Sequence, residues 1–270
     1  MWQKIKKIGA VLIIIILLPY IVTFFLNRES IQAKKESLLD KYCVRMLANE
    51  VSSEYDRSML RVQAVLVRTT VYSEAKELSR EKVEKFLQES DRIPFEWEKT
   101  LEEVWEETEG QVVMYEDAPA LVPFHQISNG KTRSGKEALG SDDYPYLQVL
   151  DCPKDIGADN QMQTEVLNLS GASVAKKDSA GYVLEVKVGE EVCNGEEFRE
   201  TYGLVSACYE LQEFDSKTRV VTRGVGHGLG LSQFTANEMA KEGKTYQEIL
   251  AYFFPTTEIK EVAEILWDTE

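Results

Sequence analysis

Residues 223–243 read RGVGHGLGLSQFTANEMAKEG and differ most clearly from ordinary scaffold sequence. Four glycines fall within seven residues near the start of this segment, which lets the backbone adopt positive φ angles or approach a ligand closely. His227 lies among the glycines, and Ser232 and Gln233 begin a predicted helix whose first N–H groups lack partners within the helix. The segment has neither the Lys-Ser/Thr ending of a P-loop nor a G-x-G-x-x-G pattern, so support for a nucleotide site is weak.

The pattern around this segment predicts an α+β domain in which helices flank a mixed or antiparallel sheet. Apolar residues at helical spacing predict one helix over residues 38–51 and a second over 57–79, with Asp56 as its N-cap. Residues 74–116 hold 14 acidic and 6 basic side chains, which predicts helices with a solvated acidic face or, alternatively, an acidic interaction surface. The remaining predictions are strands within residues 111–124, 182–188, 204–212 and 219–224, a surface loop over 130–143, and helices ending near 242 and before Pro255.

A second unusual segment, LANEVSSEYDRSMLRVQAVLVRTTVY, covers residues 47–72. Glu50 ends the first predicted helix beside the apolar residues Leu47 and Val51. Apolar surroundings disfavour the charged form of a carboxyl, so its pKa rises and it can donate a proton to a leaving oxygen near neutral pH. The alternative is that Glu50 simply faces water, as most glutamates on amphipathic helices do.

The N-terminal part of the sequence predicts a single membrane anchor. Residues 8–26 are free of charged side chains, and 19 residues of helix span about 28 Å, close to the thickness of the hydrocarbon layer. Three lysines within residues 1–7 favour a cytoplasmic tail, and no small-x-small site follows as a cleaved signal peptide would need. Residues 27–37 then form a juxtamembrane stalk, and residues 38–270 form an extracytoplasmic domain.

The net charge and the numbers of cysteines and histidines limit which partners, disulfides and metal sites the chain can have. The net charge of −15 would repel a phosphate polymer, so nucleic acid is a poor candidate, whereas an uncharged or zwitterionic polymer remains allowed. The four cysteines, at positions 43, 152, 193 and 208, are widely spaced and are compatible with either disulfides or buried thiols. With two histidines in the whole chain, a structural zinc is possible but has no ligand spacing behind it, and no cofactor is predicted.

Four segments of the sequence resemble the stage II sporulation protein D family. Residues 224–259 resemble its C-terminal pattern, roughly G-x-GHG-x-G-x-SQ-x-x-A-x-x-x-A-x-x-G followed by a Tyr–Ile–Leu helix and an aromatic-Pro stop. Residues 58–69 are in step with its E-A-L-K-A-Q-A-V-A-A-R-T-Y motif. HQISNGKT at 125–132 and DDYPYLQVLD at 142–151 are similar to its S-x-G-G-x-T loop and its P-Y-L-x-x-V-x-D segment. The resemblance runs in one order over about residues 38–260.

This resemblance implies a lytic transglycosylase that cleaves the glycan strands of peptidoglycan, with Glu50 as the catalytic acid. The C6 hydroxyl of the muramic acid acts as the nucleophile and leaves a 1,6-anhydro end, so one carboxyl serves as acid and then as base, without the second carboxyl of ordinary glycosidases. The family's preference is for strands stripped of stem peptides by a partner amidase, stage II sporulation protein P, in an engulfment complex that protein M completes. The implied location is the cell membrane, with residues 38–270 facing the intermembrane space.

The same resemblance suggests a set of residues that line the glycan groove. The sequence departs from the family at two positions, because Arg61 stands where the family has Lys and Asn129 replaces a glycine of the S-x-G-G-x-T loop. Some family members bind zinc through Cys and His near this loop, and this sequence has only His125 there. One alternative is a non-catalytic amidase-enhancer or glycan-binding module that stimulates a partner hydrolase, and another is a structural member of an engulfment complex that docks through residues 74–116. The predicted substrate-binding residues are Arg61, Gln63, Arg68, His125, Ser128, Lys131, Thr132, Tyr146, His227, Ser232 and Gln233.

Overall fold

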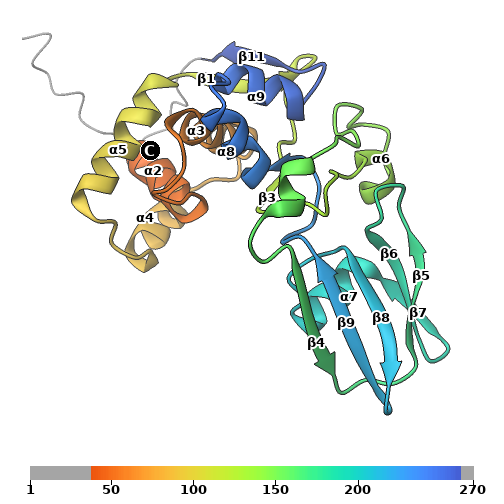
Figure 1. Cartoon of the computed structure of the whole chain (residues 1–270). Coiled ribbons are helices and arrows are strands. Elements are labelled where there is room, and N and C mark those ends of the chain that lie inside the picture. The colour runs from red at the N-terminus through yellow and green to blue at the C-terminus, as the bar shows by residue number, and fades with distance from the viewer. Residues whose placement is uncertain (1–37, 263–270) are drawn as a thin grey trace, which may run out of the picture. The chain divides into compact units, whose positions relative to one another are not determined.

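The computed structural model describes residues 38–262, and residues 43–262 belong to one compact unit (Figure 1). Helices and sheets are mixed along this unit, which confirms the predicted α+β class. Within residues 38–262, none of the helices combines the length and the apolar composition that a membrane crossing needs. The predicted anchor, residues 8–26, lies outside the described residues.

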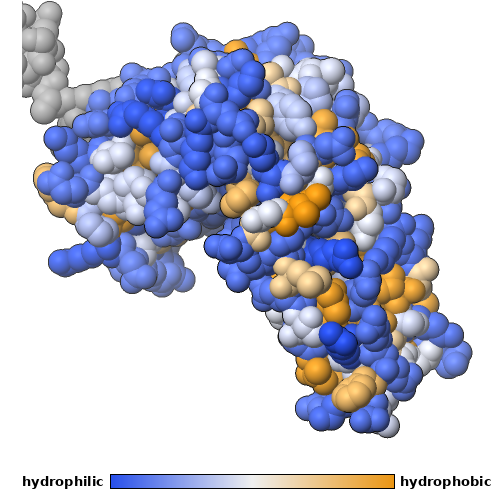
Figure 2. Space-filling model, viewed as in Figure 1, coloured by the Kyte–Doolittle hydropathy of each residue, from blue (hydrophilic) through white to orange (hydrophobic). Residues whose placement is uncertain are grey.

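The N-terminal part of the unit is helical and follows the predicted order. Asp56 caps the second helix as predicted, because its side chain accepts a hydrogen bond from the backbone N–H of Ser58 at 2.8 Å. This helix ends at Ser73, before the predicted residue 79, and Ser79 caps a separate helix by accepting from the N–H of Lys82. The four helices are α2 (Leu38–Glu50), α3 (Arg57–Ser73), α4 (Arg80–Glu89) and α5 (Phe95–Glu107). Hydrophilic residues cover most of the visible surface of α4 and α5 (Figure 2).

The larger hydrophobic core forms around α3, most of whose side chains are buried. Met59, Val62 and Leu66 of α3 pack with residues of the C-terminal helices and of a small antiparallel sheet in the order β11-β1-β2. The sheet is joined to α3 by a hydrogen bond from the backbone N–H of Val113 to Oγ1 of Thr69. The elements around α3 are β1 (Gln111–Tyr115), β2 (Ala118–Pro119), α8 (Gln233–Lys241), α9 (Tyr246–Phe253) and β11 (Glu258–Glu261).

A second core lies between two three-stranded antiparallel sheets and one helix, seen together in Figure 1. The sheets have the strand orders β4-β9-β8 and β5-β6-β7, and Phe198 of the helix packs against Val183 and Val220 from the two sheets. Only β6, β8 and β9 had a predicted counterpart in the sequence. The elements are β4 (Met162–Leu167), β5 (Ala172–Lys177), β6 (Val183–Val188), β7 (Glu191–Asn194), α7 (Gly195–Tyr202), β8 (Tyr209–Phe214) and β9 (Lys217–Arg223).

The glycine-rich segment connects β9 to α8 and runs between the two cores. It leads into β10 (Leu231–Ser232), which pairs in parallel with β3 (Phe124–His125). Gly224, Gly226, Gly228 and Gly230 all have positive φ angles, as their spacing suggested. Gly228 has a φ of +79°, and a Cβ atom at this position would lie 2.2 Å from the ring of buried Tyr182. Glycine is therefore required here for space as well as for backbone conformation.

Replacing Gly228 by alanine should destabilise the protein strongly, by about 2–5 kcal/mol, because a left-handed backbone and a clash with a buried ring add together. Gly140→Ala is the matched control, because Gly140 has a φ of +68° but nothing within 4 Å of the added Cβ. That control should lose only about 1–2 kcal/mol of unfolding free energy. Equal losses of unfolding free energy for the two variants in urea denaturation would show that packing against Tyr182 does not require glycine at position 228.

Candidate functional site

The two unusual segments of the sequence meet at Glu50. Nε2 of Gln233, in the first turn of α8, donates a hydrogen bond of 2.9 Å to the backbone carbonyl oxygen of Glu50 at the end of α2. The same Nε2 lies 3.2 Å from Oε1 of Gln63 on α3. Both glutamine side chains are buried. Because the last carbonyl groups of a helix have no partners within it, Gln233 satisfies one of them and fixes the position of Glu50.

The side chain of Glu50 lies at the surface but not in an ordinary aqueous environment. The residue is exposed, yet loss of part of its hydration to the surrounding protein raises the pKa of its carboxyl above the ordinary value of 4.5. The hydroxyl of half-buried Tyr55 lies 3.5 Å from Oε1 of Gln233, next to the same carbonyl contact. A carboxyl in this position is accessible to a ligand and retains its proton to a higher pH than a fully hydrated glutamate.

Asp155 holds the first turn of α8 in place and was not identified from the sequence. The side chain is fully buried and accepts hydrogen bonds from Oγ of Ser232 at 2.7 Å and from Oγ1 of Thr235 at 2.6 Å. It also accepts from the backbone N–H of Ser128 at 2.7 Å. Asp155 thus connects the 125–132 loop to the helix that carries Gln233. No sequence pattern distinguishes this aspartate from surface residues, because its partners lie 27 to 80 positions away.

The two histidines lie close together, with ring centroids 5.8 Å apart, and both contact the backbone of Leu229. The carbonyl of Leu229 can only accept, so Nδ1 of His125 donates to it at 3.2 Å. The N–H of Leu229 donates to Nδ1 of His227 at 3.0 Å. Nε2 of His125 is buried and has no hydrogen-bond partner among the described residues. Burial is the main cause that lowers the pKa of both histidine rings, and it lowers the pKa of His125 to about 3. Both rings are therefore neutral at physiological pH.

Eight of the eleven predicted substrate-binding residues are buried, which assigns their polar groups mainly to supporting the loops. Thr132 donates to the carbonyl of Gln148, and the hydroxyl of Tyr146 accepts from the N–H of Leu121. The buried residues are Gln63, Arg68, His125, Ser128, Thr132, Tyr146, Ser232 and Gln233. The sequence predicted that these residues cluster near the glycine segment, but it did not predict their burial. The same types of polar residue support loops and face ligands, so sequence alone does not separate the two roles.

The predicted cations have partners of their own. Arg68 donates to the carbonyl oxygens of Trp105 and Thr108, where the end of α5 carries a partial negative charge. Arg61 is half-buried and pairs with Glu107 at 2.7 Å, and exposed Lys131 lies 3.7 Å from Asp151. Together with half-buried His227, Arg61 and Lys131 are the predicted contacts that retain access to solvent.

A further buried cation, Arg133, supports the glycine segment from the other side. Its Nε pairs with buried Asp178 at 2.7 Å, and its Nη1 contacts Glu196 at 2.7 Å and the carbonyl oxygen of His227 at 3.2 Å. The backbone N–H of Arg133 donates to the carbonyl oxygen of Gly228. This network joins α7 and the loop after β5 to the backbone at His227. Removing one partner would leave an uncompensated buried charge.

The cysteines are all free thiols, so the disulfide alternative is not realised in this structure. Burial raises the pKa of Cys152 to about 12, which makes it a poor nucleophile or metal ligand at neutral pH. Within residues 38–262, no group of three or more His, Cys, Asp and Glu side chains is arranged to hold a metal ion.

Comparisons with known proteins show what the chain is similar to in sequence. Residues 27–115 match the family model described as "Stage II sporulation protein". The chain is 27% identical over 272 residues to stage II sporulation protein D of Bacillus subtilis (strain 168), covering 88% of this chain and 79% of that protein. The predicted resemblance to stage II sporulation protein D is confirmed. The protein of that name from Bacillus amyloliquefaciens is 25% identical, with 84% of this chain and 76% of the relative covered. Glu50 lies within the range of the family model, and the glycine-rich segment lies beyond it.

The buried histidine should make the stability of the protein depend on pH. An unfolded chain binds a proton on His125 below pH 6.5, whereas the folded chain does so only near pH 3, so the unfolding free energy rises with pH between these values. Lowering the pH from 7 to 5 should therefore cost about 2 kcal/mol through this one ring.

The measurement is urea denaturation at both pH values for the wild type and for His125→Asn. Asparagine keeps an N–H donor for Leu229 but cannot titrate. The variant should show a weaker pH dependence, and an identical dependence in the two proteins would contradict the burial of a neutral His125.

Proposed function

We propose that this chain is a membrane-anchored lytic transglycosylase that cleaves peptidoglycan glycan strands during sporulation, with Glu50 as the acid and base. The observation that carries the proposal is the contact between Gln233 and the carbonyl oxygen of Glu50. The accessible carboxyl of the same residue, whose pKa is raised by partial loss of hydration, supports the proposal. The similarity to stage II sporulation protein D supports the sporulation setting.

In the proposed reaction, protonated Glu50 donates its proton to the glycosidic oxygen as the bond to the muramic acid C1 breaks. The resulting carboxylate then accepts the proton of the C6 hydroxyl as its oxygen bonds to C1, which closes the 1,6-anhydro ring. The cycle returns Glu50 to its protonated form and consumes no water. A single carboxyl with a raised pKa is sufficient for both steps, so the chemistry does not need a second acid.

Substrate contact is assigned to the accessible residues of the predicted set, which are Arg61, Lys131 and His227. The buried residues of the set act by holding Glu50 and the glycine segment in place. The two cations would bind the lactyl carboxylates of muramic acid in place of Glu107 and Asp151, with which they pair in this structure. The partners proposed for the protein are stage II sporulation proteins P and M. The proposed location is the cell membrane, through residues 8–26.

Replacing Glu50 by glutamine should abolish cleavage while the fold survives, because an amide of the same shape cannot transfer the proton. The measurement is mass spectrometry of denuded glycan strands after digestion, in which wild-type protein should give 1,6-anhydromuramyl ends. Glu54→Gln is the matched control, because Glu54 is an exposed glutamate in the nearby connection between α2 and α3. Equal activity of Glu50→Gln and wild type would contradict the assignment. Products with reducing muramic ends would indicate hydrolysis by a muramidase.

The second candidate function is a non-catalytic amidase-enhancer or glycan-binding module. The exposure of Glu50 and the burial of most predicted contact residues favour it. In that case the protein binds denuded glycan without cleaving it and stimulates a partner amidase. The Glu50→Gln variant should then do both as well as the wild type.

A further inference from the structure

The connection between α2 and α3, residues 51–56, is held at both of its ends by the same helix, α8. At its start, the carbonyl oxygen of Glu50 accepts a hydrogen bond from Nε2 of Gln233. At its end, the backbone N–H of Asp56 donates to Oδ1 of Asn237 at 2.8 Å. Gln233 and Asn237 lie four positions apart on α8, so their side chains project from the same face of this helix. One face of α8 therefore binds the connection at two points.

The contact at Asp56 satisfies a backbone group that α3 cannot satisfy by itself. Asp56 is the N-cap of α3, and its side chain accepts from the N–H of Ser58, but its own N–H has no partner within the helix. Asn237 is buried and supplies that partner. Without this acceptor, the N–H of half-buried Asp56 would have to move toward water to find a partner, because an unsatisfied buried donor is costly.

The middle of the connection is also held in place. The N–H of Tyr55 donates to the carbonyl oxygen of Ser52 at 3.1 Å, and the N–H of Glu54 donates to Oγ of Ser52 at 3.2 Å, which closes a turn. The ring of Tyr55 packs against the larger core. A connection of six residues with a closed turn has little slack, so a movement of Asp56 would reach the end of α2 and Glu50.

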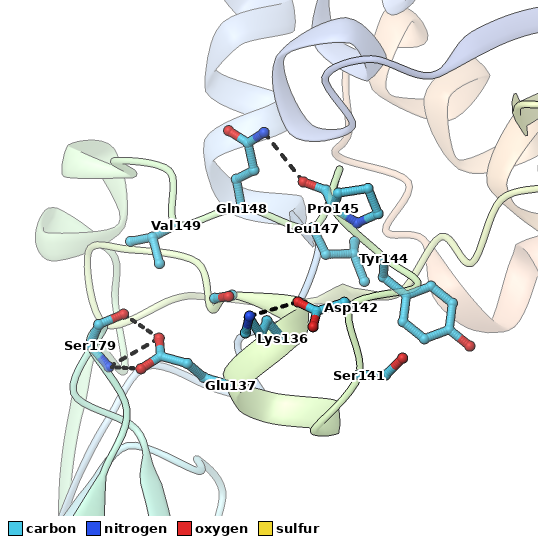
Figure 3. Close-up of a pocket in the computed structure, with 11 residues that line it drawn as sticks. Lys136, Glu137, Ser141, Asp142, Tyr144, Pro145, Leu147, Gln148, Val149 and Ser179 are labelled. Atoms are coloured by element: carbon cyan, nitrogen blue, oxygen red, sulfur yellow. Dashed lines mark hydrogen bonds and ion pairs between the residues drawn. The ribbon is translucent and has the colours of Figure 1, made fainter.

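The polar side chains beside the short helix α6 (Gly135–Leu139) have a different role. Lys136 forms an ion pair of 2.8 Å with Asp142, and the carboxylate of Glu137 accepts from the backbone N–H and the hydroxyl of Ser179 (Figure 3). These pairs account for the charged side chains that line the depression beside α6 within the described chain. They stabilise that surface locally, whereas Asn237 connects two segments that lie 181 positions apart.

We propose that Asn237 is a positioning residue that, together with Gln233, keeps Glu50 at a fixed place relative to α8. The proposal rests on the proposed function, because a fixed place for Glu50 matters to catalysis only if Glu50 transfers the proton. Position 237 is unspecified in the C-terminal pattern of the family, so the resemblance gives Asn237 no role. A loosened Glu50 would spend less time within reach of the glycosidic oxygen, which lowers kcat more than it changes KM.

The test uses the full-length chain in detergent and two substitutions of Asn237. Asn237→Leu fills a similar space without an acceptor, so it should speed amide hydrogen exchange of Asp56 about 10-fold. It should also lower kcat on denuded glycan strands about 10-fold, with KM changed by less than about twofold. Asn237→Asp keeps an acceptor oxygen in the same place and should restore slow exchange and most of kcat. Ala240→Gly is the matched control, because it weakens the same helix without removing a side-chain hydrogen bond.

A site-resolved NMR titration of Glu50 separates this proposal from the proposed catalysis. In Asn237→Leu the midpoint should fall toward 4.5, because a loosened helix end gains hydration, whether or not the wild type produces anhydro ends. An unchanged midpoint overturns the proposal even if exchange at Asp56 accelerates, because Asn237 would then hold only the start of α3. An equal loss of kcat in Ala240→Gly, or no rescue by Asn237→Asp, also overturns it, because general weakening of α8 would then be sufficient.

Discussion

The hydrogen bond between Gln233 and the carbonyl oxygen of Glu50 spans 183 positions of sequence and is the contact on which the candidate site depends. Glu50 ends a helix, where its own backbone offers no partner for the last carbonyl groups. Gln233 supplies that partner only because Asp155 fixes the first turn of α8 and because the glycine segment turns the chain between β9 and β10. Without this series of contacts, the carboxyl would project from a frayed helix end into bulk water.

The glycine segment also shows how a functional region can be constrained by packing rather than by ligand contact. The ring of Tyr182 occupies the space next to Gly228, and buried Arg133 binds the carbonyl oxygen of His227. A loop held in this way has few alternative conformations, so the groups that flank it keep a defined geometry at little entropic cost on binding. The polar residues within it are used mainly inside the protein.

Local features of the fold could be predicted from the sequence, and long-range features could not. The N-cap at Asp56 and the positive φ angles of the glycines depend on neighbouring residues, so their patterns were sufficient. Strand β4 and helix α7 were missed, because β4 has largely exposed side chains and α7 spans only eight residues, too few for its spacing of apolar residues to decide a helix.

The site shows the same division between local and long-range information. The proximity of Glu50 to residues 224–233 was expected from two motifs that belong to one resemblance. The burial of residues such as Ser128 and Ser232 was not expected, because it depends on hydrogen bonds to Asp155. The role of Asp155 appears only when three separate segments of the chain come together. Family motifs therefore indicated which residues gather at the site, but not which of them face a ligand.

Glu50 is a carboxyl whose pKa is raised because the surrounding protein removes part of its hydration, at a helix end whose carbonyl oxygen is held by Gln233 of α8. The most direct test is a site-resolved NMR titration of the Glu50 side chain in the wild type and in Gln233→Ala, with Glu248 as an internal reference whose pKa is lowered by its capping hydrogen bonds. The wild-type midpoint should lie above 4.5 and should move toward that value in the variant, because a loosened helix end lets water reach the carboxyl. A wild-type midpoint at or below 4.5 would contradict the account.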